Sequence, residues 1–227
     1  MNHMPEPFGG DKKVGRSVLW LAEQRLIRWA APRVPAWIRS NHLTLATIPI
    51  SFAIVLCGYA AQTQDAWLYV GAVFIFLQWV TDSLDGAVGR LRNEGFIRWG
   101  YYMDHFLDYV FLVSVLVSYM LLLPTDFILI HFFVLAIFAG YMVHAFLAFG
   151  ATNQFRIAHL GVGPTEIRLL FIAINILLAL FGKTHLRWAL PYALGLATIG
   201  LVVVVYRAQK ELAEYDLRQK KETGASL

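Results

Sequence analysis

Long apolar runs alternate with short polar breaks along most of the chain. A helix that crosses a bilayer needs roughly 20 mostly apolar residues at about 1.5 Å rise each. Six runs meet or approach this length: residues 43–61, 66–88, 99–123, 127–150, 166–181 and 188–205, of which the fifth is short. Gly, Pro, Asp or Thr occurs in each break, as is usual in turns. The pattern therefore predicts six transmembrane helices.

A different pattern precedes the first of these runs. Within residues 15–37, apolar side chains recur at helical spacing on one side, while Gln24 and Arg28 fall on the other. Mixed Trp and Arg content is typical of a helix that lies in the headgroup region of a membrane. We therefore expect a disordered N-terminus at 1–13, a juxtamembrane amphipathic helix at 14–40, a six-helix transmembrane domain at 41–206 and a cytoplasmic tail at 207–227.

The amino-acid composition agrees with a membrane protein. Of the 227 residues, 58% are hydrophobic and 15% are charged, whereas a soluble domain carries about 25% charged residues. The single cysteine, Cys57, excludes an intrachain disulfide. The expected fold class is an all-α integral membrane protein.

The positions of Lys and Arg predict the orientation, because these residues concentrate on the cytoplasmic side of a membrane. Six spans put both termini on one side, and of the 19 Lys and Arg residues only Lys183 and Arg187 fall on the other. We therefore expect both termini, and the loop between the second and third helices, on the cytoplasmic face of a bacterial-type inner or plasma membrane. The net charge of +4 mainly reflects this bias.

Four aspartates stand where the second helix ends and the third begins. Asp82 and Asp85 are three residues apart, and Asp104 and Asp108 are four apart, so each pair shares one face of its helix. An antiparallel hairpin of the two helices can bring both faces together just inside the cytoplasmic boundary. The sequence therefore predicts one cluster of four acids near one membrane surface.

Four carboxylates this close need compensation, because repulsion and low dielectric both disfavour their charged form. Arg90 is one partial remedy. Oxygen ligands without a Cys or His cluster indicate Mg²⁺ or Mn²⁺ rather than Zn²⁺, and such sites commonly hold two ions that clamp a phosphate. Gly86, Gly89 and Gly100 lie beside the acids. They would allow a ligand to approach the backbone closely, or alternatively two helices to pack tightly.

The stretch from Asp82 to Asp108 resembles the signature of the CDP-alcohol phosphotransferase family. It reads D-x-x-D-G-x-x-G-R, nine further residues, and then G-x-x-x-D-x-x-x-D. Enzymes of that family are integral membrane proteins that move a substituted phosphate from a CDP-linked donor onto an alcohol and release CMP. Two departures stand out: the family usually has Ala at Gly89, and the spacer between Arg90 and Gly100 is one residue longer than the commonest form.

The resemblance implies roles for individual residues. Asp82, Asp85, Asp104 and Asp108 would hold two metal ions, and Asp108 would also be the catalytic base that takes the proton of the acceptor hydroxyl.

Other residues of the same motif would contact the donor. Gly86, Gly89 and Arg90 would lie against the nucleotide and its phosphates. The stretch SNHLT resembles a family segment that often reads P-N-x-L-T, so Asn41 and Thr44 would reach the donor as well. The resemblance also implies a homodimer.

Polar residues at the start of the fifth helix allow two interpretations. Thr165 as N-cap, with Glu166 in the first turn, is a common helix start. Alternatively, Arg156, Glu166 and Arg168 line the acceptor pocket, because Arg side chains suit an anionic acceptor.

Three functions remain to be compared. The leading hypothesis is a phosphatidyl transfer from CDP-diacylglycerol to a small polar alcohol in phospholipid biosynthesis, with the bilayer as a partner and no nucleic acid. An alternative is a CDP-choline or CDP-ethanolamine phosphotransferase acting on diacylglycerol. Those members of the family also have an Asp-His pair at the position that Asp104 and His105 occupy here. A cation or proton transporter would place acids near the midplane, in inverted repeats, and no repeat is detectable here.

Overall fold

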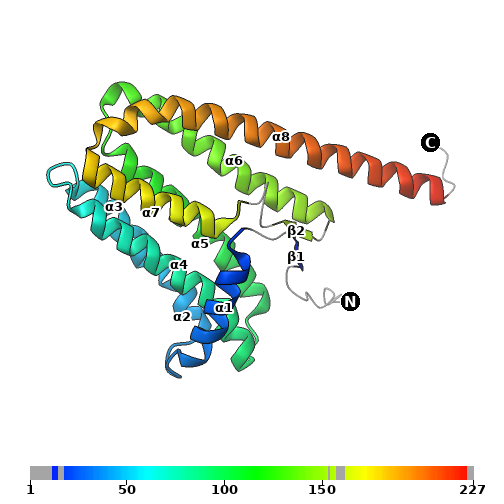
Figure 1. Ribbon diagram of the computed structural model, residues 1–227. Helices are drawn as coiled ribbons and strands as arrows, with labels where there is room; N and C mark the ends of the chain where they lie inside the picture. Colours follow the sequence, from blue (N-terminus) through cyan, green and yellow to red (C-terminus); the bar gives the residue numbers. More distant parts are fainter. Residues whose placement is uncertain (1–11, 15–17, 153, 157–161, 224–227) are drawn as a thin grey trace, which may run out of the picture.

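Six helical stretches of the structure are long and apolar enough to cross a membrane (Figure 1). The computed structural model describes residues 12–14, 18–152, 154–156 and 162–223. The spans are Ser40–Ala60, Trp67–Arg92, Ile97–Met120, Thr125–Thr152, Pro164–Phe181 and Thr184–Lys220. An additional helix precedes them. The predicted all-α membrane fold, with six spans and an N-terminal helix, is confirmed.

The helices follow one another with short connections. In chain order they are α1 (Trp20–Ala30), η1 (Ala31–Arg33), α2 (Ser40–Leu45), α3 (Thr47–Ala60), α4 (Trp67–Arg92), α5 (Ile97–Met120), η2 (Thr125–Phe127), α6 (Ile128–Thr152), α7 (Pro164–Phe181) and α8 (Thr184–Thr223). Two short strands, β1 (Lys12–Val14) and β2 (Gln154–Arg156), pair in parallel. The expected disorder of residues 1–13 falls mostly outside the described residues, and its last two positions belong to β1.

Several helix ends differ from the expected ones. The N-terminal helix covers residues 20–30 rather than all of 14–40, because Pro32 and Pro35 lack the backbone N–H that a longer helix needs. Helix α4 runs four residues past Val88, to Arg92, and its C-cap is Asn93, whose φ of 53° is left-handed. All of the residues between Asp82 and Arg90 are therefore helical.

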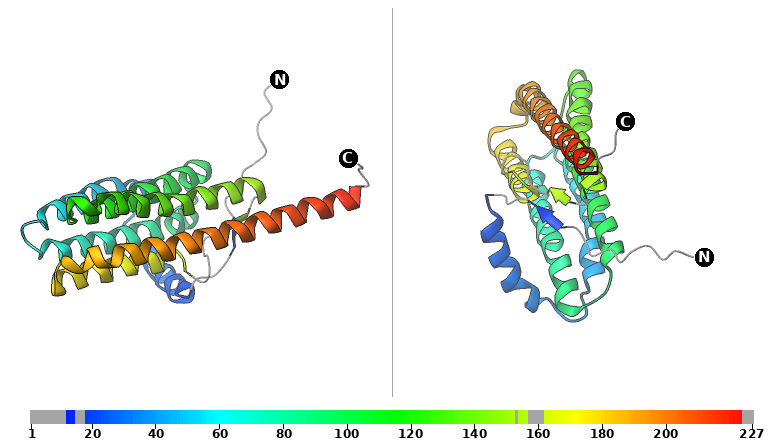
Figure 2. Two further views of the ribbon diagram at one scale, coloured as in Figure 1. Left: turned by 90° about the horizontal axis from the view of Figure 1, so that it is seen from above. Right: turned by 90° about the vertical axis from the view of Figure 1, so that its right-hand side faces the viewer.

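Two groups of helices build the bundle (Figures 1 and 2). Helix α3 packs against α4 and α5, and α4 packs against α7, whereas α6 pairs with α8. Helix α2 lies against both α4 and α5, and α1 with η1 covers α4. In the first group α3 connects α4 to α5, and α4 also packs against α7, so the group can bring polar side chains from three helices together.

The core of the first group is apolar. Ile54, Ile75, Phe111, Val115 and Phe171 are all buried in one cluster. In a bilayer such packing stabilises mainly through van der Waals contact. This cluster fixes the positions of the helices that carry the candidate site.

A glycine allows α3 and α5 to cross at short distance. A Cβ placed on Gly58 of α3 would lie 2.6 Å from both Cα and Cβ of Ser118 in α5. A real Cβ does not tolerate such a contact with backbone, so α3 and α5 can approach this closely only because residue 58 has no side chain.

Two basic residues hold connections at opposite ends of the bundle. The Arg92 guanidinium donates to the carbonyl oxygens of Val34 at 2.6 Å and Ile38 at 2.5 Å. At the other end, Lys183 Nζ donates to the carbonyl oxygen of Ala61 at 2.7 Å and pairs with Asp65 at 2.9 Å. In the sequence, both residues served only to predict the orientation in the membrane. In the structure, both also hold the segments that connect helices.

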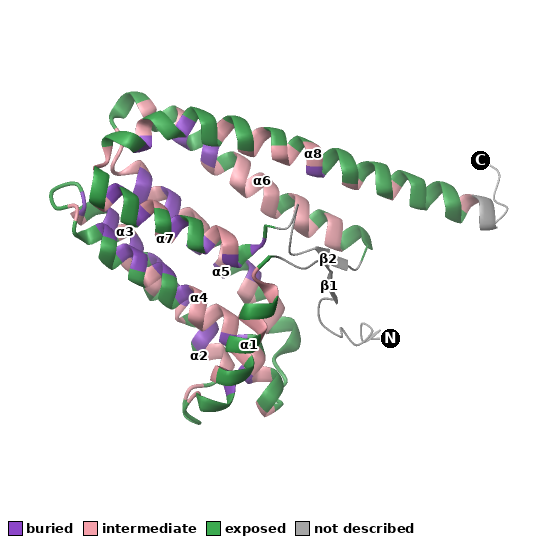
Figure 3. Cartoon of the chain, in the orientation of Figure 1, coloured by how far each residue is buried: buried purple, intermediate pink, exposed green. Residues whose placement is uncertain are grey.

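Helix α8 continues without a break from the sixth span into the segment expected to be a tail. Its last turns project beyond the other helices and are largely exposed (Figures 1 and 3). Exposed apolar side chains such as Phe132 on α6 and Leu196 on α8 cover the outer faces of the pair. Such faces suit contact with lipid.

Candidate active site

Acidic residues from two helices surround one arginine of a third. Arg168 of α7, only 4% exposed, donates from Nη2 to Asp82 Oδ2 on α4 at 2.9 Å and to Asp108 Oδ1 on α5 at 2.6 Å. Asp104 is also close enough to interact electrostatically with Arg168. Acids from α4 and α5 thus meet at one arginine of α7, and α2 and α3, which pack against both α4 and α5, hold the two helices near each other.

Gln78 completes this network, and the sequence analysis missed it. Its side chain is fully buried, its Oε1 accepts from Arg168 Nε at 2.6 Å, and its Nε2 lies 3.4 Å from Asp82 Oδ1. Gln78 precedes Asp82 by four residues, so the two share a helix face. A glutamine at that spacing inside an otherwise apolar run was the available signal.

Asp85 faces a different neighbour. Thr44 Oγ1 of α2 donates to Asp85 Oδ2 at 2.6 Å, and the backbone N–H of Gly86 donates to its Oδ1. Asp85 is 8% exposed and therefore the most buried of the four acids. Thr44, expected to reach the donor, thus contacts a candidate metal ligand.

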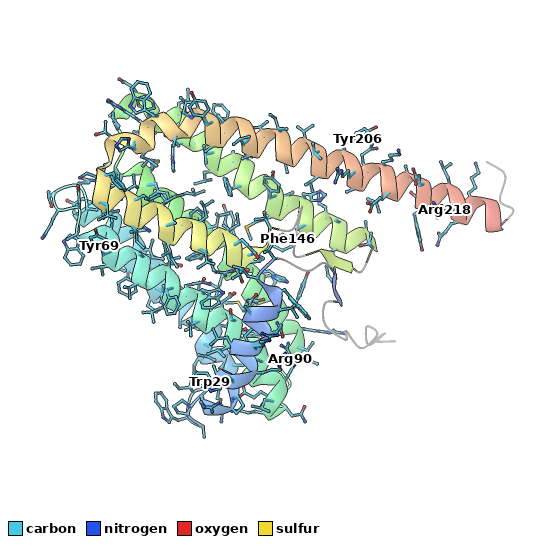
Figure 4. The ribbon with its side chains drawn as sticks, in the orientation of Figure 1. Trp29, Tyr69, Arg90, Phe146, Tyr206 and Arg218 are labelled. Atoms are coloured by element: carbon cyan, nitrogen blue, oxygen red, sulfur yellow. The ribbon has the colours of Figure 1, made fainter. Side chains whose placement is uncertain are left out.

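The glycines next to the acids have different surroundings. A Cβ on Gly89 would lie 3.2 Å from Ser40 Oγ, so Gly89 allows α2 to approach α4 closely. Gly86 is exposed, and the exposed Arg90 lies over it, with Nη1 3.2 Å from the position of a Cβ. Figure 4 places Arg90 and Tyr69 towards opposite ends of α4. Helix packing therefore explains why a glycine stands at position 89. Gly86 instead leaves an exposed surface beside the guanidinium of Arg90.

Asn41 adds a polar group at the start of the first span. Its Oδ1 is buried and has no hydrogen-bond partner among the described residues. A buried acceptor without a partner is costly, so a donor group supplied by a ligand would stabilise it.

Two of the three residues expected to line an acceptor pocket lie near the start of α7 and make different contacts. Glu166 closes the start of α7: its Oε2 accepts from the N–H of Gly163 and its Oε1 from the N–H of Leu19, both at 2.9 Å. Gly163 rather than Thr165 is the N-cap. Arg168 belongs to the acid cluster instead. Arg156 lies in β2, and its side chain is outside the described part of the chain.

The carboxylate oxygens of the four aspartates suit a hard cation, although in this structure they contact protein side chains instead. Carboxylate oxygens are the ligands that Mg²⁺ and Mn²⁺ prefer. Within the residues that the structure describes, no three His, Cys, Asp or Glu side chains are already arranged to hold an ion. Asp82 and Asp108 face Arg168, and Asp85 faces Thr44. Two metal ions therefore stay a prediction that the chemistry of the residues supports.

His105 lies beside this cluster on α5. Its Nδ1 is 3.8 Å from Asp104 Oδ2, and its ring meets that of Tyr101 edge-on with 4.5 Å between centroids. The Phe146 ring of α6 is 5.8 Å away. His105 thus lies between α5 and α6, next to Asp104.

Comparisons with known proteins agree with this arrangement. The family model for CDP-alcohol phosphatidyltransferase matches residues 37–206. Cholinephosphotransferase 1 of Gallus gallus is 30% identical over 112 residues, which cover 46% of this chain and 32% of the relative. The matched stretch thus spans about a third of the relative's length. Because the family model covers most of the sequence, including the first five spans, the beginning of the sixth and the four aspartates, the chain belongs to the CDP-alcohol phosphatidyltransferase family.

Proposed function

We propose that the protein transfers a substituted phosphate from a CDP-linked donor to the hydroxyl of an alcohol, with release of CMP, in phospholipid synthesis. The observation that carries this proposal is the gathering of Asp82 and Asp108 around Arg168, inside the region that the family model matches. The transfer needs acids, a positive charge and a reachable base at one place, and this cluster has all three.

The residues can take distinct parts in the reaction. The acceptor oxygen would form a bond to the phosphorus, the bond from phosphorus to the CMP oxygen would break, and CMP would leave with the electron pair. Asp108, whose side chain is 24% exposed, would accept the hydroxyl proton. Arg90 would attract the phosphates from the open side of Gly86.

Divalent ions would add to this charge stabilisation. When bound, Mg²⁺ or Mn²⁺ held by Asp82, Asp85, Asp104 and Asp108 would neutralise charge on the phosphoryl oxygens. Thr44 would orient Asp85, because outer hydrogen bonds hold a ligating carboxylate in place.

Two pairs of substrates fit the proposal. The first is CDP-diacylglycerol with a small polar alcohol, and the description of the matching family, phosphatidyl transfer, favours it. The second is CDP-choline or CDP-ethanolamine with diacylglycerol. The similarity to a cholinephosphotransferase and the Asp104-His105 pair favour this second arrangement.

Purified protein tests both arrangements in one assay. CMP release is measured with CDP-diacylglycerol and a panel of alcohols, and separately with CDP-choline or CDP-ethanolamine and diacylglycerol. We expect release with one donor class, and a fall of roughly 100-fold or more when EDTA removes divalent ions. Release that persists in EDTA would contradict metal dependence. No release with any pair, together with cation flux in proteoliposomes, would favour the transporter.

Replacing Thr44 by Val should lower CMP release by about 10- to 100-fold, because Asp85 loses the hydroxyl that orients it. The loss should be partly recovered at higher Mn²⁺ concentration. Thr63→Val is the matched control, since Thr63 is exposed and its hydroxyl donates to the carbonyl oxygen of Ala60. Equal activity of the two variants would show that Thr44 has no role at the site.

We also propose that the acid cluster faces the cytoplasm and that the protein forms a homodimer. The distribution of Lys and Arg supports the orientation, and the family resemblance supports the dimer. Labelling of a single cysteine introduced at Arg218, from either side of sealed vesicles, would test the orientation.

A further inference from the structure

We infer that Arg168 is an internal cation that competes with divalent metal ions for Asp82 and Asp108, and so controls metal occupancy of the candidate site. The inference rests on the proposed function, because it takes these aspartates as metal ligands. It gives Arg168 a positioning role that differs from the acceptor pocket expected from the sequence.

The contacts of Arg168 are those of a cation held by ligands. A single nitrogen, Nη2, lies 2.9 Å from Asp82 Oδ2 and 2.6 Å from Asp108 Oδ1. These oxygens come from two different helices, so the guanidinium bridges α4 and α5. A metal ion that used the same two oxygens would have to displace Nη2 from them.

A second anchor keeps the guanidinium in place. Arg168 Nε donates to Gln78 Oε1 at 2.6 Å, and the guanidinium carbon lies 5.3 Å from the centre of the Phe111 ring. Gln78 is not a candidate metal ligand, and its side chain is fully buried. The Nε contact can therefore persist when Nη2 leaves the carboxylates, so Arg168 would move aside without leaving the site.

Charge decides when Arg168 would be displaced. Buried charges are stable only when they are paired, and without metal ions Arg168 is the only buried cation that the described residues place between these acids. Two doubly charged ions would instead neutralise all four carboxylates, and a guanidinium a few ångströms away would repel them. The released Nη2 could then pair with the phosphates of the donor, which bring new negative charge.

Mn²⁺ binding to the full-length protein in detergent tests the inference directly. Free Mn²⁺ is measured by electron paramagnetic resonance for the wild type, Arg168→Met, Arg168→Lys and Gln78→Met. We expect Arg168→Met to bind Mn²⁺ about tenfold or more tightly than the wild type, because the competing charge is gone. Arg168→Lys keeps the charge and should stay near the wild type. Gln78→Met loosens the anchor and should tighten binding by a smaller factor.

Thermal unfolding adds a second readout. Without metal, Arg168→Met should unfold at a lower temperature than the wild type, because Asp82 and Asp108 lose the positive charge that pairs with them. On addition of Mn²⁺, the unfolding temperature of Arg168→Met should rise by more than that of the wild type. Arg218→Met removes an exposed charge at the far end of α8 and controls for net charge. It should match the wild type in both measurements.

The outcomes separate the inference from the proposed function. Mn²⁺ binding that is no tighter in Arg168→Met and Gln78→Met than in the wild type would overturn the inference while leaving the function intact. If Arg168→Met does not fold, Gln78→Met decides alone. Absence of Mn²⁺ binding in every variant would instead overturn the metal-dependent function.

Discussion

Replacing Asp108 by Asn should lower CMP release by about 10²- to 10⁴-fold, the usual contribution of a general base. Asn keeps the shape of the side chain but cannot accept the acceptor's proton. Arg168 would keep Asp82 as a partner, so the fold should survive the change. The loss should appear mainly in kcat, because the proton moves during the chemical step. Steady-state release of CMP, with the best substrate pair, measures it.

The matched control for this variant is Asp126→Asn. Asp126 is an exposed acid in η2, at the start of the fourth span, and therefore at the opposite end of the bundle from the cluster. It should retain the wild-type rate. Full transfer activity in Asp108→Asn, with an unchanged unfolding temperature, would mean that another group is the base.

Replacing Gly58 by Ala should destabilise the protein by about 3 kcal/mol or more, in the upper part of the usual range for overpacking. The added methyl would meet the backbone of Ser118 at 2.6 Å, and helix backbone cannot rotate away as a flexible side chain can. Helices α3 and α5 would have to separate. Unfolding in mixed detergent micelles with increasing SDS, followed by circular dichroism, measures the change.

Gly195→Ala provides the comparison within the same chain. Gly195 lies inside α8, and a Cβ there would meet no heavy atom within 4 Å. Ala is the better helix former by up to about 1 kcal/mol, so this variant should be as stable as the wild type or more so. Equal stability of the two variants would show that α3 and α5 do not cross as closely as the structure indicates.

Much of the fold could be predicted because hydropathy reports directly on membrane spans. The ends of the helices could not. Gly89 and Arg90 resemble a break, yet α4 continues through them and stops only at Asn93, where the backbone becomes left-handed. Gly89 allows contact with another helix, here with Ser40 at the start of α2. A single sequence does not show which helices touch.

The spacing of the four acids drew attention to them, but it did not indicate their partners. Arg168 is separated from Asp82 by 86 residues and from Asp108 by 60. The packing of α7 against α4 brings Arg168 to Asp82, whereas Asp108 belongs to α5, which packs on α3. The same holds for Thr44 and Asp85, which meet because α2 lies against α4.

The link between Glu166 and Leu19 makes the N-terminal helix more than a detachable membrane anchor. Glu166 stands two residues before Arg168, and one of its carboxylate oxygens fastens the first turn of α7 to the beginning of α1. Trimming the chain up to Trp20 would remove that attachment and leave a carboxylate to find a new donor. Shortened versions of the protein should therefore be judged by how they bind metal as well as by how they sit in a membrane.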